Sequence, residues 1–326
     1  MLAAPQPAAT GHGGAPGGTD TDLLPTDNRS SAIHVKAESA LQPTESPSDG
    51  RNTLRALAWT PSSDEASSAA ASTIVLLHGL GDGANIWRPM MASWKTPLPV
   101  LALDLPGHGG SPWLSSAPYE IRTLARHVAE ALGERRLHRP VLVGHSLGAR
   151  IAVELVSGQA ITPAATILVD MNAGDNEAVR QAVRAHLDVL LAGAPSLTAL
   201  EQLLLARLPL ADHWAVSTVV RASAVEAGGR WRIPLDPAVI GLVAPSRSQS
   251  EVWQRLADIR GPAALIRGAF SGVLDRRTAD RIAQVLPWRP PIIETVDDAG
   301  HAIPLEQPAF LARSIEKCLR SWRIVT

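Results

Sequence analysis

The chain has 326 residues, of which 45% are hydrophobic and 19% are charged, and its formal net charge is −1. This length suits one large domain, and the balanced charge provides no general electrostatic attraction for nucleic acid. Cys318 is the only cysteine, which excludes an intramolecular disulfide and a cysteine-rich metal site.

Residues 1–31 are rich in Ala, Gly, Pro, Thr and Asp and contain few large apolar side chains. Such a segment buries too little apolar surface to offset the entropy of ordering, so we expect a disordered tail. It lacks a basic region followed by a long apolar run, and no stretch of the chain approaches the ~20 apolar residues of a membrane-spanning helix. We therefore expect a cytoplasmic protein without membrane or nucleic-acid partners.

Residues 32–173 are expected to form the first part of an α/β core. Two alternating stretches, residues 32–40 and 52–60, are candidate edge strands. Short apolar runs follow, which are typical of strands buried on both faces. They are separated by helical patterns near residues 85–95, 119–133 and 147–157. These runs begin at Thr73 (TIVLLHG) and continue at Pro99–Leu105, Pro140–Gly144 and Ala165–Asp170. The alternation predicts a mostly parallel sheet with helices on both faces.

The alternation stops after Asp170, and residues 176–226 have the spacing of amphipathic helices. We expect residues 174–255 to form a helical lid inserted into the core. The core resumes over residues 256–326, with strands at Ala263–Arg267 and Pro291–Val296 and helices at Thr278–Leu286 and Ala309–Trp322.

The segment Gly144-His145-Ser146-Leu147-Gly148 follows a predicted buried strand and begins a predicted helix. A sharp turn from strand to helix strains the backbone at the serine, and glycines two residues to each side allow neighbouring backbone to approach closely. The hydroxyl then stands clear of the sheet. Ser146 is therefore the candidate nucleophile, and the alternative is that it only caps the helix.

A serine hydroxyl needs a general base and a site for the negative charge that develops on the substrate oxygen. His301 is the candidate base, because it lies just past a predicted strand, after a glycine, and later in the chain than the serine. The candidate oxyanion donors are the amides of Leu147, the first residue of its helix, and of Leu80, in the turn after a buried strand.

From about Thr73 onward the chain resembles the bacterial serine esterases of the α/β-hydrolase fold family. The resemblance rests on four motifs in order, which are LLHGLGD, DLPGHGGS at Asp104–Ser111, GHSLG and DDAGHAIPLEQP at Asp297–Pro308. It implies an eight-stranded sheet with a helical lid after the sixth strand, and hydrolysis at a carbonyl without a metal or an organic cofactor. It also implies that Asp104 and His108 shape a turn rather than act in catalysis.

The chain departs from the family in the acid of the catalytic triad. Relatives usually carry it in the loop after the seventh strand, where the matching position here is Gly272. Asp170, at the end of the sixth strand, is the preferred candidate, because some related hydrolases place the acid there. Asp275 is the alternative acid, although it also suits the N-cap of the following helix. A Ser–His pair without a carboxylate is the third possibility.

These features predict a serine hydrolase that cleaves a carboxylic ester or a related acyl compound through an acyl-enzyme intermediate. We expect a small, apolar substrate selected by the lid, and no cofactor or metal. Hydrolysis of a lactone, a thioester or a carbon–carbon bond is an alternative, as is a degenerate hydrolase that binds a small molecule. The sequence leaves the oligomeric state open.

Overall fold

The structure of this chain, a computed structural model, describes residues 43–46, 53–61, 72–171, 173–174, 176–243 and 249–325. The predicted tail, residues 1–31, and the candidate edge strand at residues 32–40 lie outside the described residues. Within the ranges given above, no helix combines the length and the apolar character needed to cross a membrane.

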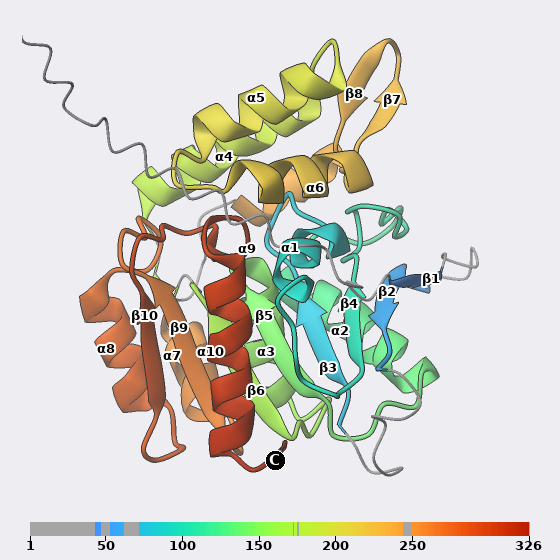
Figure 1. Cartoon of the computed structure of the whole chain (residues 1–326). Coiled ribbons are helices and arrows are strands. Elements are labelled where there is room, and N and C mark those ends of the chain that lie inside the picture. Colours follow the sequence, from blue (N-terminus) through green and yellow to red (C-terminus); the bar gives the residue numbers. More distant parts are fainter. Residues whose placement is uncertain are drawn as a thin grey trace, which may run out of the picture. The chain divides into compact units, whose positions relative to one another are not determined.

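An eight-stranded sheet forms the centre of the described part of the chain (Figure 1). Its order is β1-β2-β4-β3-β5-β6-β9-β10, and every neighbouring pair from β4 to β10 is parallel, whereas β2 runs antiparallel to both of its neighbours. The predicted mostly parallel sheet is thus confirmed. The strands are β1 (Thr44–Ser46), β2 (Ala56–Trp59), β3 (Ile74–Leu77), β4 (Val100–Leu103), β5 (Val141–His145), β6 (Ala165–Val169), β9 (Ala263–Gly268) and β10 (Ile292–Val296).

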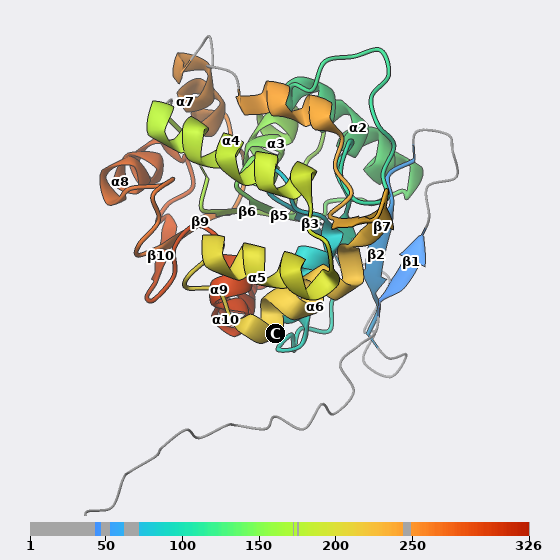
Figure 2. The ribbon, with the colours of Figure 1, turned by 90° about the horizontal axis from the view of Figure 1, so that it is seen from above.

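Helices cover both faces of this sheet (Figure 2). One face carries α2 (Ile121–Glu134), α3 (Leu147–Ser157) and α7 (Gln249–Ala257), and the other carries α10 (Pro308–Ser321). Every residue of β3 to β6 and of β9 is consequently buried, which explains why these strands read as continuous apolar runs. Near the edge of the sheet, α8 (Arg276–Val285) packs against β9 and α7.

The helix predicted at residues 85–95 is shorter than expected. A 3₁₀ turn, η1 (Ala84–Trp87), leads into α1 (Arg88–Met91), which is a single turn with Pro89 in its first positions. A proline lacks the amide hydrogen that a helix interior uses, so an α-helix can only begin near it. Position 89 therefore divides the predicted helix into two short pieces.

Three helices follow β6 and lie together beyond the sheet, above the ends of its strands (Figure 1). They are α4 (Glu177–Ala192), α5 (Leu197–Arg207) and α6 (His213–Ser223). Each begins with a side-chain cap, in which Asn176, Ser196 or Asp212 accepts a backbone amide of the first turn. These are the helices predicted for the lid.

The second half of this inserted segment was not predicted in detail. A hairpin of β7 (Val225–Ala227) and β8 (Arg230–Arg232) turns at Gly228 and Gly229, both of which have a positive φ. Its strands have three residues each and none is buried, so the sequence carries no alternating apolar signal. After η2 (Pro237–Val243), α7 packs against α3 and α8, so the expected end of the lid at residue 255 falls inside a helix of the sheet layer.

Candidate active site

Ser146 lies between β5 and α3, in a backbone conformation with φ 52° and ψ −111° that a residue other than glycine rarely adopts. The close packing around it requires the flanking glycines. A Cβ at Gly148 would collide with the carbonyl of Leu77 in β3, and a Cβ at Gly144 would collide with the backbone of Gly148. The strand-to-helix turn is therefore the tight elbow that the sequence pattern predicts.

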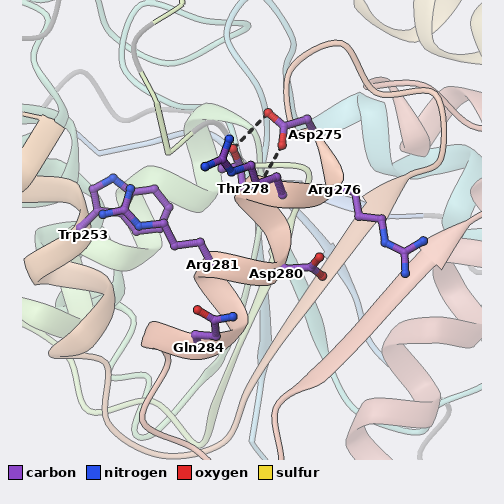
Figure 3. A pocket seen from close by; sticks show the side chains of 8 residues that line it. Trp253, Asp275, Arg276, Thr278, Asp280, Arg281 and Gln284 are labelled. Atoms are coloured by element: carbon purple, nitrogen blue, oxygen red, sulfur yellow. Dashed lines mark hydrogen bonds between the residues drawn. The ribbon is translucent and has the colours of Figure 1, made fainter.

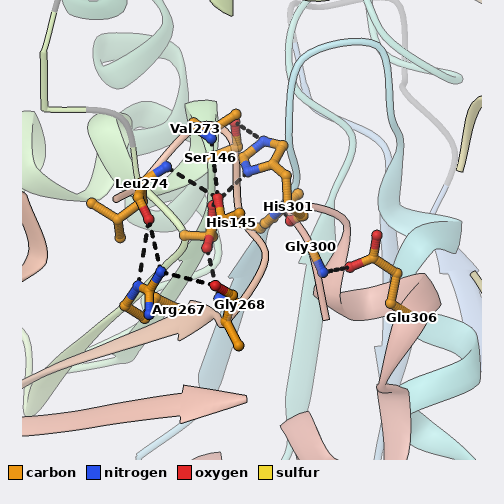
Figure 4. A network of polar contacts seen from close by, with 12 residues as sticks. His145, Ser146, Arg267, Gly268, Val273, Leu274, Gly300, His301 and Glu306 are labelled. Carbon is orange, nitrogen blue, oxygen red and sulfur yellow. Dashed lines mark hydrogen bonds and ion pairs between the residues drawn. The ribbon is translucent and has the colours of Figure 1, made fainter. Parts of the chain in front are cut away.

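His301 lies in the loop after β10 and contacts both the serine and a carboxylate (Figure 4). Its Nε2 is 3.0 Å from Oγ of Ser146, and its Nδ1 is 2.7 Å from Oδ1 of Asp170. In the tautomer that fits these contacts, Nδ1–H donates a hydrogen bond to the carboxylate, and Nε2 accepts a hydrogen bond from the Ser146 hydroxyl. The three side chains thus form a continuous hydrogen-bonded series.

Asp170 follows β6 directly and is completely buried. Besides His301, its carboxylate accepts the Gly268 amide at 2.8 Å and the Ser271 hydroxyl at 2.5 Å. Ser271 is itself fixed, because its Oγ accepts the amides of Val273 and Leu274 at 3.1 and 3.0 Å. The loop after β9 carries glycine at position 272, where the family resemblance places the acid, and it contributes Ser271 as a donor to Asp170 instead.

Asp275, the alternative acid, is not brought to the imidazole. It caps α8, where its carboxylate accepts the Thr278 amide at 2.7 Å and the Thr278 hydroxyl at 3.1 Å. The hydrogen bond from the Thr278 amide is the main cause that lowers the pKa of Asp275. It lines a separate surface hollow over α7 and α8, in which the guanidinium of Arg281 stacks 4.0 Å from the ring centre of Trp253 (Figure 3).

Two further residues hold the backbone next to the imidazole. The Gly300 amide donates to the buried carboxylate of Glu306 at 2.7 Å, and Nε2 of His145 donates to the carbonyl of His301 at 2.8 Å. Burial, reinforced by the neighbouring His301, lowers the pKa of His145 to about 3, so its ring is neutral near pH 7. The sequence analysis did not single out Glu306, although it lies within the motif that contains His301.

The two candidate oxyanion donors, Leu80 and Leu147, both line the cavity beside Ser146. As the first residue of α3, Leu147 has an amide with no helical acceptor one turn earlier. The turn that carries Leu80 is fixed by buried His78, whose Nδ1–H donates to the Gly79 carbonyl at 2.7 Å and whose Nε2 accepts the Leu105 amide at 2.9 Å. Burial lowers the pKa of His78, which favours the neutral ring that these two contacts require.

Asp104 and His108 take part in the turn after β4 rather than in the hydrogen-bonded series around Ser146. The Asp104 carboxylate accepts the amides of Ala84 and Gly110 at 2.6 and 2.9 Å and pairs with Arg55 at 2.8 Å. His108 is completely buried, and its Nδ1 lies 3.0 Å from the Pro106 carbonyl. Through these contacts Asp104 and His108 shape the turn after β4, as the family resemblance implies.

The cavity has a volume of about 530 Å³ and is lined by the sheet edge and by the helices above it. Apolar side chains make up much of its wall, among them Leu80, Ile86, Ile121, Val179, Val183, Leu208, Leu242 and Val243. Its polar lining, which the sequence analysis did not identify, includes Asp82, Arg150, Asn176, Arg180, His186 and Arg207. Among the described residues, no three His, Cys, Asp or Glu side chains are grouped so as to hold a metal ion.

Comparisons with known proteins agree on one family. A model of the alpha/beta hydrolase family matches residues 74–314. The esterase Rv0045c of Mycobacterium tuberculosis is 25% identical over 257 residues, which cover 77% of this chain and 83% of that protein. The lipase LipV of the same organism is 33% identical over 115 residues, which cover 35% of this chain and 43% of the lipase.

Solved structures repeat the same fold. The crystal structure of E-2-(acetamidomethylene)succinate hydrolase matches with a TM-score of 0.73 and 21% identity, covering 85% of this chain and 99% of that chain. The crystal structure of Rv0045c from Mycobacterium tuberculosis matches with a TM-score of 0.65 and 23% identity, covering 85% of this chain and 91% of the other. At these identities the likeness shows the fold.

Proposed function

Because the chain belongs to the alpha/beta hydrolase family, we propose that it is a serine hydrolase that cleaves a carboxylic ester or a related acyl compound through an acyl-enzyme intermediate. The observation that carries this proposal is the series Ser146–His301–Asp170, with contacts of 3.0 and 2.7 Å. The nucleophile and the orienting carboxylate are thus each within hydrogen-bonding reach of the base, which is the geometry that acyl transfer to a serine needs.

The reaction proceeds in two halves. Oγ of Ser146 attacks the acyl carbon while Nε2 of His301 accepts the hydroxyl proton, and the amides of Leu80 and Leu147 hold the developing oxyanion. His301 then gives the proton to the leaving oxygen, which departs as the alcohol. A water molecule, deprotonated by the same imidazole, attacks the acyl-serine; the bond from the acyl carbon to Oγ then breaks, the imidazolium returns the proton to Oγ, and the acid is released. Throughout, Asp170 stabilises the imidazolium and holds its tautomer.

Three observations support the hydrolysis of an ester as the function. The alternative of a degenerate hydrolase that only binds a small molecule is based on the absence of an acid at position 272. The imidazole of His301 nevertheless has a carboxylate partner, because Asp170 lies 2.7 Å from it. The apolar part of the cavity wall suits a substrate with a hydrocarbon portion. Esterase Rv0045c, which is similar over most of this chain, is named for the same class of activity.

Labelling with a fluorophosphonate tests the proposal, because the reagent reacts with an activated serine much faster than with an ordinary hydroxyl. We expect the native chain to be labelled at Ser146, the Ser146→Ala variant not to react, and His301→Ala to react at least about a hundredfold more slowly. Heat-denatured protein is the control for nonspecific reaction. A panel of p-nitrophenyl esters from acetate to laurate then reports the preferred chain length. A native chain that is neither labelled nor active on any ester of the panel contradicts the proposal.

A further inference from the structure

Three of the described arginines line the cavity, and Arg150 is the one that lies nearest to Ser146 in the sequence. It lies on α3, and its amide donates to the Ser146 carbonyl at 3.2 Å. The side chain lines the same cavity as Ser146, together with apolar Ile121, Leu242 and Val243. Within the described part of the chain, the half-buried guanidinium makes no hydrogen bond or ion pair.

This lack of a partner distinguishes Arg150 from Arg55, Arg180 and Arg255, which are also partly buried. The Arg55 guanidinium pairs with Asp104 at 2.8 Å, and that of Arg255 pairs with Glu154 at 2.9 Å. In the cavity wall itself, Arg180 pairs with Glu177. Removing a cation from water without a counter-charge costs free energy, and burial accordingly lowers the pKa of Arg150. A cavity that contains such a group together with the nucleophile is suited to an anion.

The other titratable groups that face the cavity leave it electropositive. Among the described lining residues, Arg150, Arg180 and Arg207 are cations and Asp82 is the only carboxylate. Burial raises the pKa of Asp82 to about 6, and its Oδ2 lies 3.8 Å from Nδ1 of His145, next to the turn that carries Leu80. Burial, and then the field of Arg207, lowers the pKa of His186 to about 4, so His186 is neutral near pH 7.

We propose that the substrate carries a carboxylate group and that Arg150 binds it while Ser146 attacks the ester. This inference rests on the proposed function and names its substrate class, an ester of a small organic acid with one free carboxylate. The planar guanidinium can donate two parallel hydrogen bonds to such a group. The charge of the half-buried Arg150 guanidinium matches a single negative charge, and the apolar walls take the carbon chain between the carboxylate and the ester.

Matched pairs of esters that differ only in charge test this specificity. Methyl hydrogen glutarate and methyl glutaramate place a carboxylate or a neutral amide on the acyl side of the ester. O-acetylglycolate and O-acetylglycolamide place the same groups on the alcohol side. We expect kcat/KM of the native chain to be about tenfold or more higher for the charged member of at least one pair. Equal or faster turnover of the neutral member in both pairs overturns the proposal.

Variants then assign the preference to Arg150. Arg150→Met keeps the length and the apolar stem of the side chain, and we expect it to lower the ratio of kcat/KM for the charged over the neutral ester to about one. Arg150→Lys keeps the charge and should retain part of the preference. Arg126→Met is the matched control, because Arg126 pairs with Glu130 on an exposed part of α2, outside the cavity. A preference that survives in Arg150→Met overturns the proposal.

A binding measurement separates this proposal from the proposed function. The Ser146→Ala variant does not depend on turnover, and calorimetry can measure its affinity for methyl hydrogen glutarate with and without Arg150→Met. Weakening by about tenfold on loss of Arg150 supports the carboxylate site even if no ester is hydrolysed, in which case only the proposed function fails. Hydrolysis of esters without a charge preference, and binding that Arg150→Met leaves unchanged, refute the carboxylate site alone.

Discussion

The carboxylate of Asp170 accepts three hydrogen bonds, from His301, Ser271 and the Gly268 amide. An asparagine at this position keeps the shape of the side chain but loses the charge that stabilises the imidazolium, and it can hold the wrong tautomer. We predict that Asp170→Asn lowers kcat by roughly a thousandfold to ten-thousandfold, measured on the best p-nitrophenyl ester. The circular dichroism spectrum should remain that of the native chain.

Asp275→Ala is the companion variant. The substitution removes the side-chain acceptor at the start of α8. We therefore expect a free energy of unfolding lower by about 0.5–2 kcal/mol and activity within about twofold of the native value. Comparable small losses of activity in both variants would argue against Asp170 as the acid.

Ser271 belongs to the loop after β9 and donates a hydrogen bond to the same Asp170 carboxylate. Removing its hydroxyl takes one hydrogen bond from Asp170 and leaves the Val273 and Leu274 amides without their acceptor. We predict that Ser271→Ala reduces kcat by about tenfold with little change in KM, and that Ser271→Thr restores most of it. A change confined to KM would show that the loop contacts substrate rather than orienting the carboxylate.

At the scale of elements, the elbow depends on how closely α3 approaches β3. A Cβ at Gly148 would collide with backbone of β3, which cannot move without disturbing the sheet. We predict that Gly148→Ala lowers the free energy of unfolding by more than about 2 kcal/mol, measured by urea denaturation.

Gly133 provides the matched control for this change. It lies in the last turn of α2, where an added Cβ meets nothing within 4 Å. Alanine has the higher helix propensity, so Gly133→Ala should be neutral or stabilising by up to about 1 kcal/mol. If both alanines had the same small effect, the close approach of α3 to β3 would not be what requires glycine at position 148.

At the scale of the whole molecule, buried histidines make stability depend on pH. Burial lowers the pKa of both His108 and His145 to about 3, below the ordinary value of 6.5 that the unfolded chain regains. The unfolded state therefore binds more protons between pH 6.5 and about 3, so stability falls as the pH decreases through this window. Asp82 opposes the trend, because its pKa of about 6 lies above the unfolded value of 3.8.

We predict that the free energy of unfolding decreases from pH 7 to pH 5 by about 2 kcal/mol for each of the two histidines, measured by urea denaturation. His108→Gln removes one titrating group that lies outside the cavity, so the slope of stability against pH should become shallower whatever its effect at pH 7. A variant with the native slope would show that His108 is not among the groups responsible.

The sequence by itself determined the parts of the fold whose signal is local. Apolar runs and the glycines around Ser146 identify buried strands and the elbow, because burial on both faces and a tight turn each restrict the residues that fit. The order of strands and helices then follows from the alternation. Ser146 and His301 were identified in the same way, each from its own turn, and their proposed roles await the experiments above.

Only the tertiary structure decided which side chains meet. Asp170 and His301 are 131 positions apart, and either candidate carboxylate satisfied the local pattern until the path of the loop after β9 placed Asp275 on α8. The same holds for Arg150, because a helix presents side chains in all directions and only the packing of the inserted helices shows which of them face the cavity. Contacts of this kind depend on three-dimensional proximity, which neighbouring residues in the sequence do not encode.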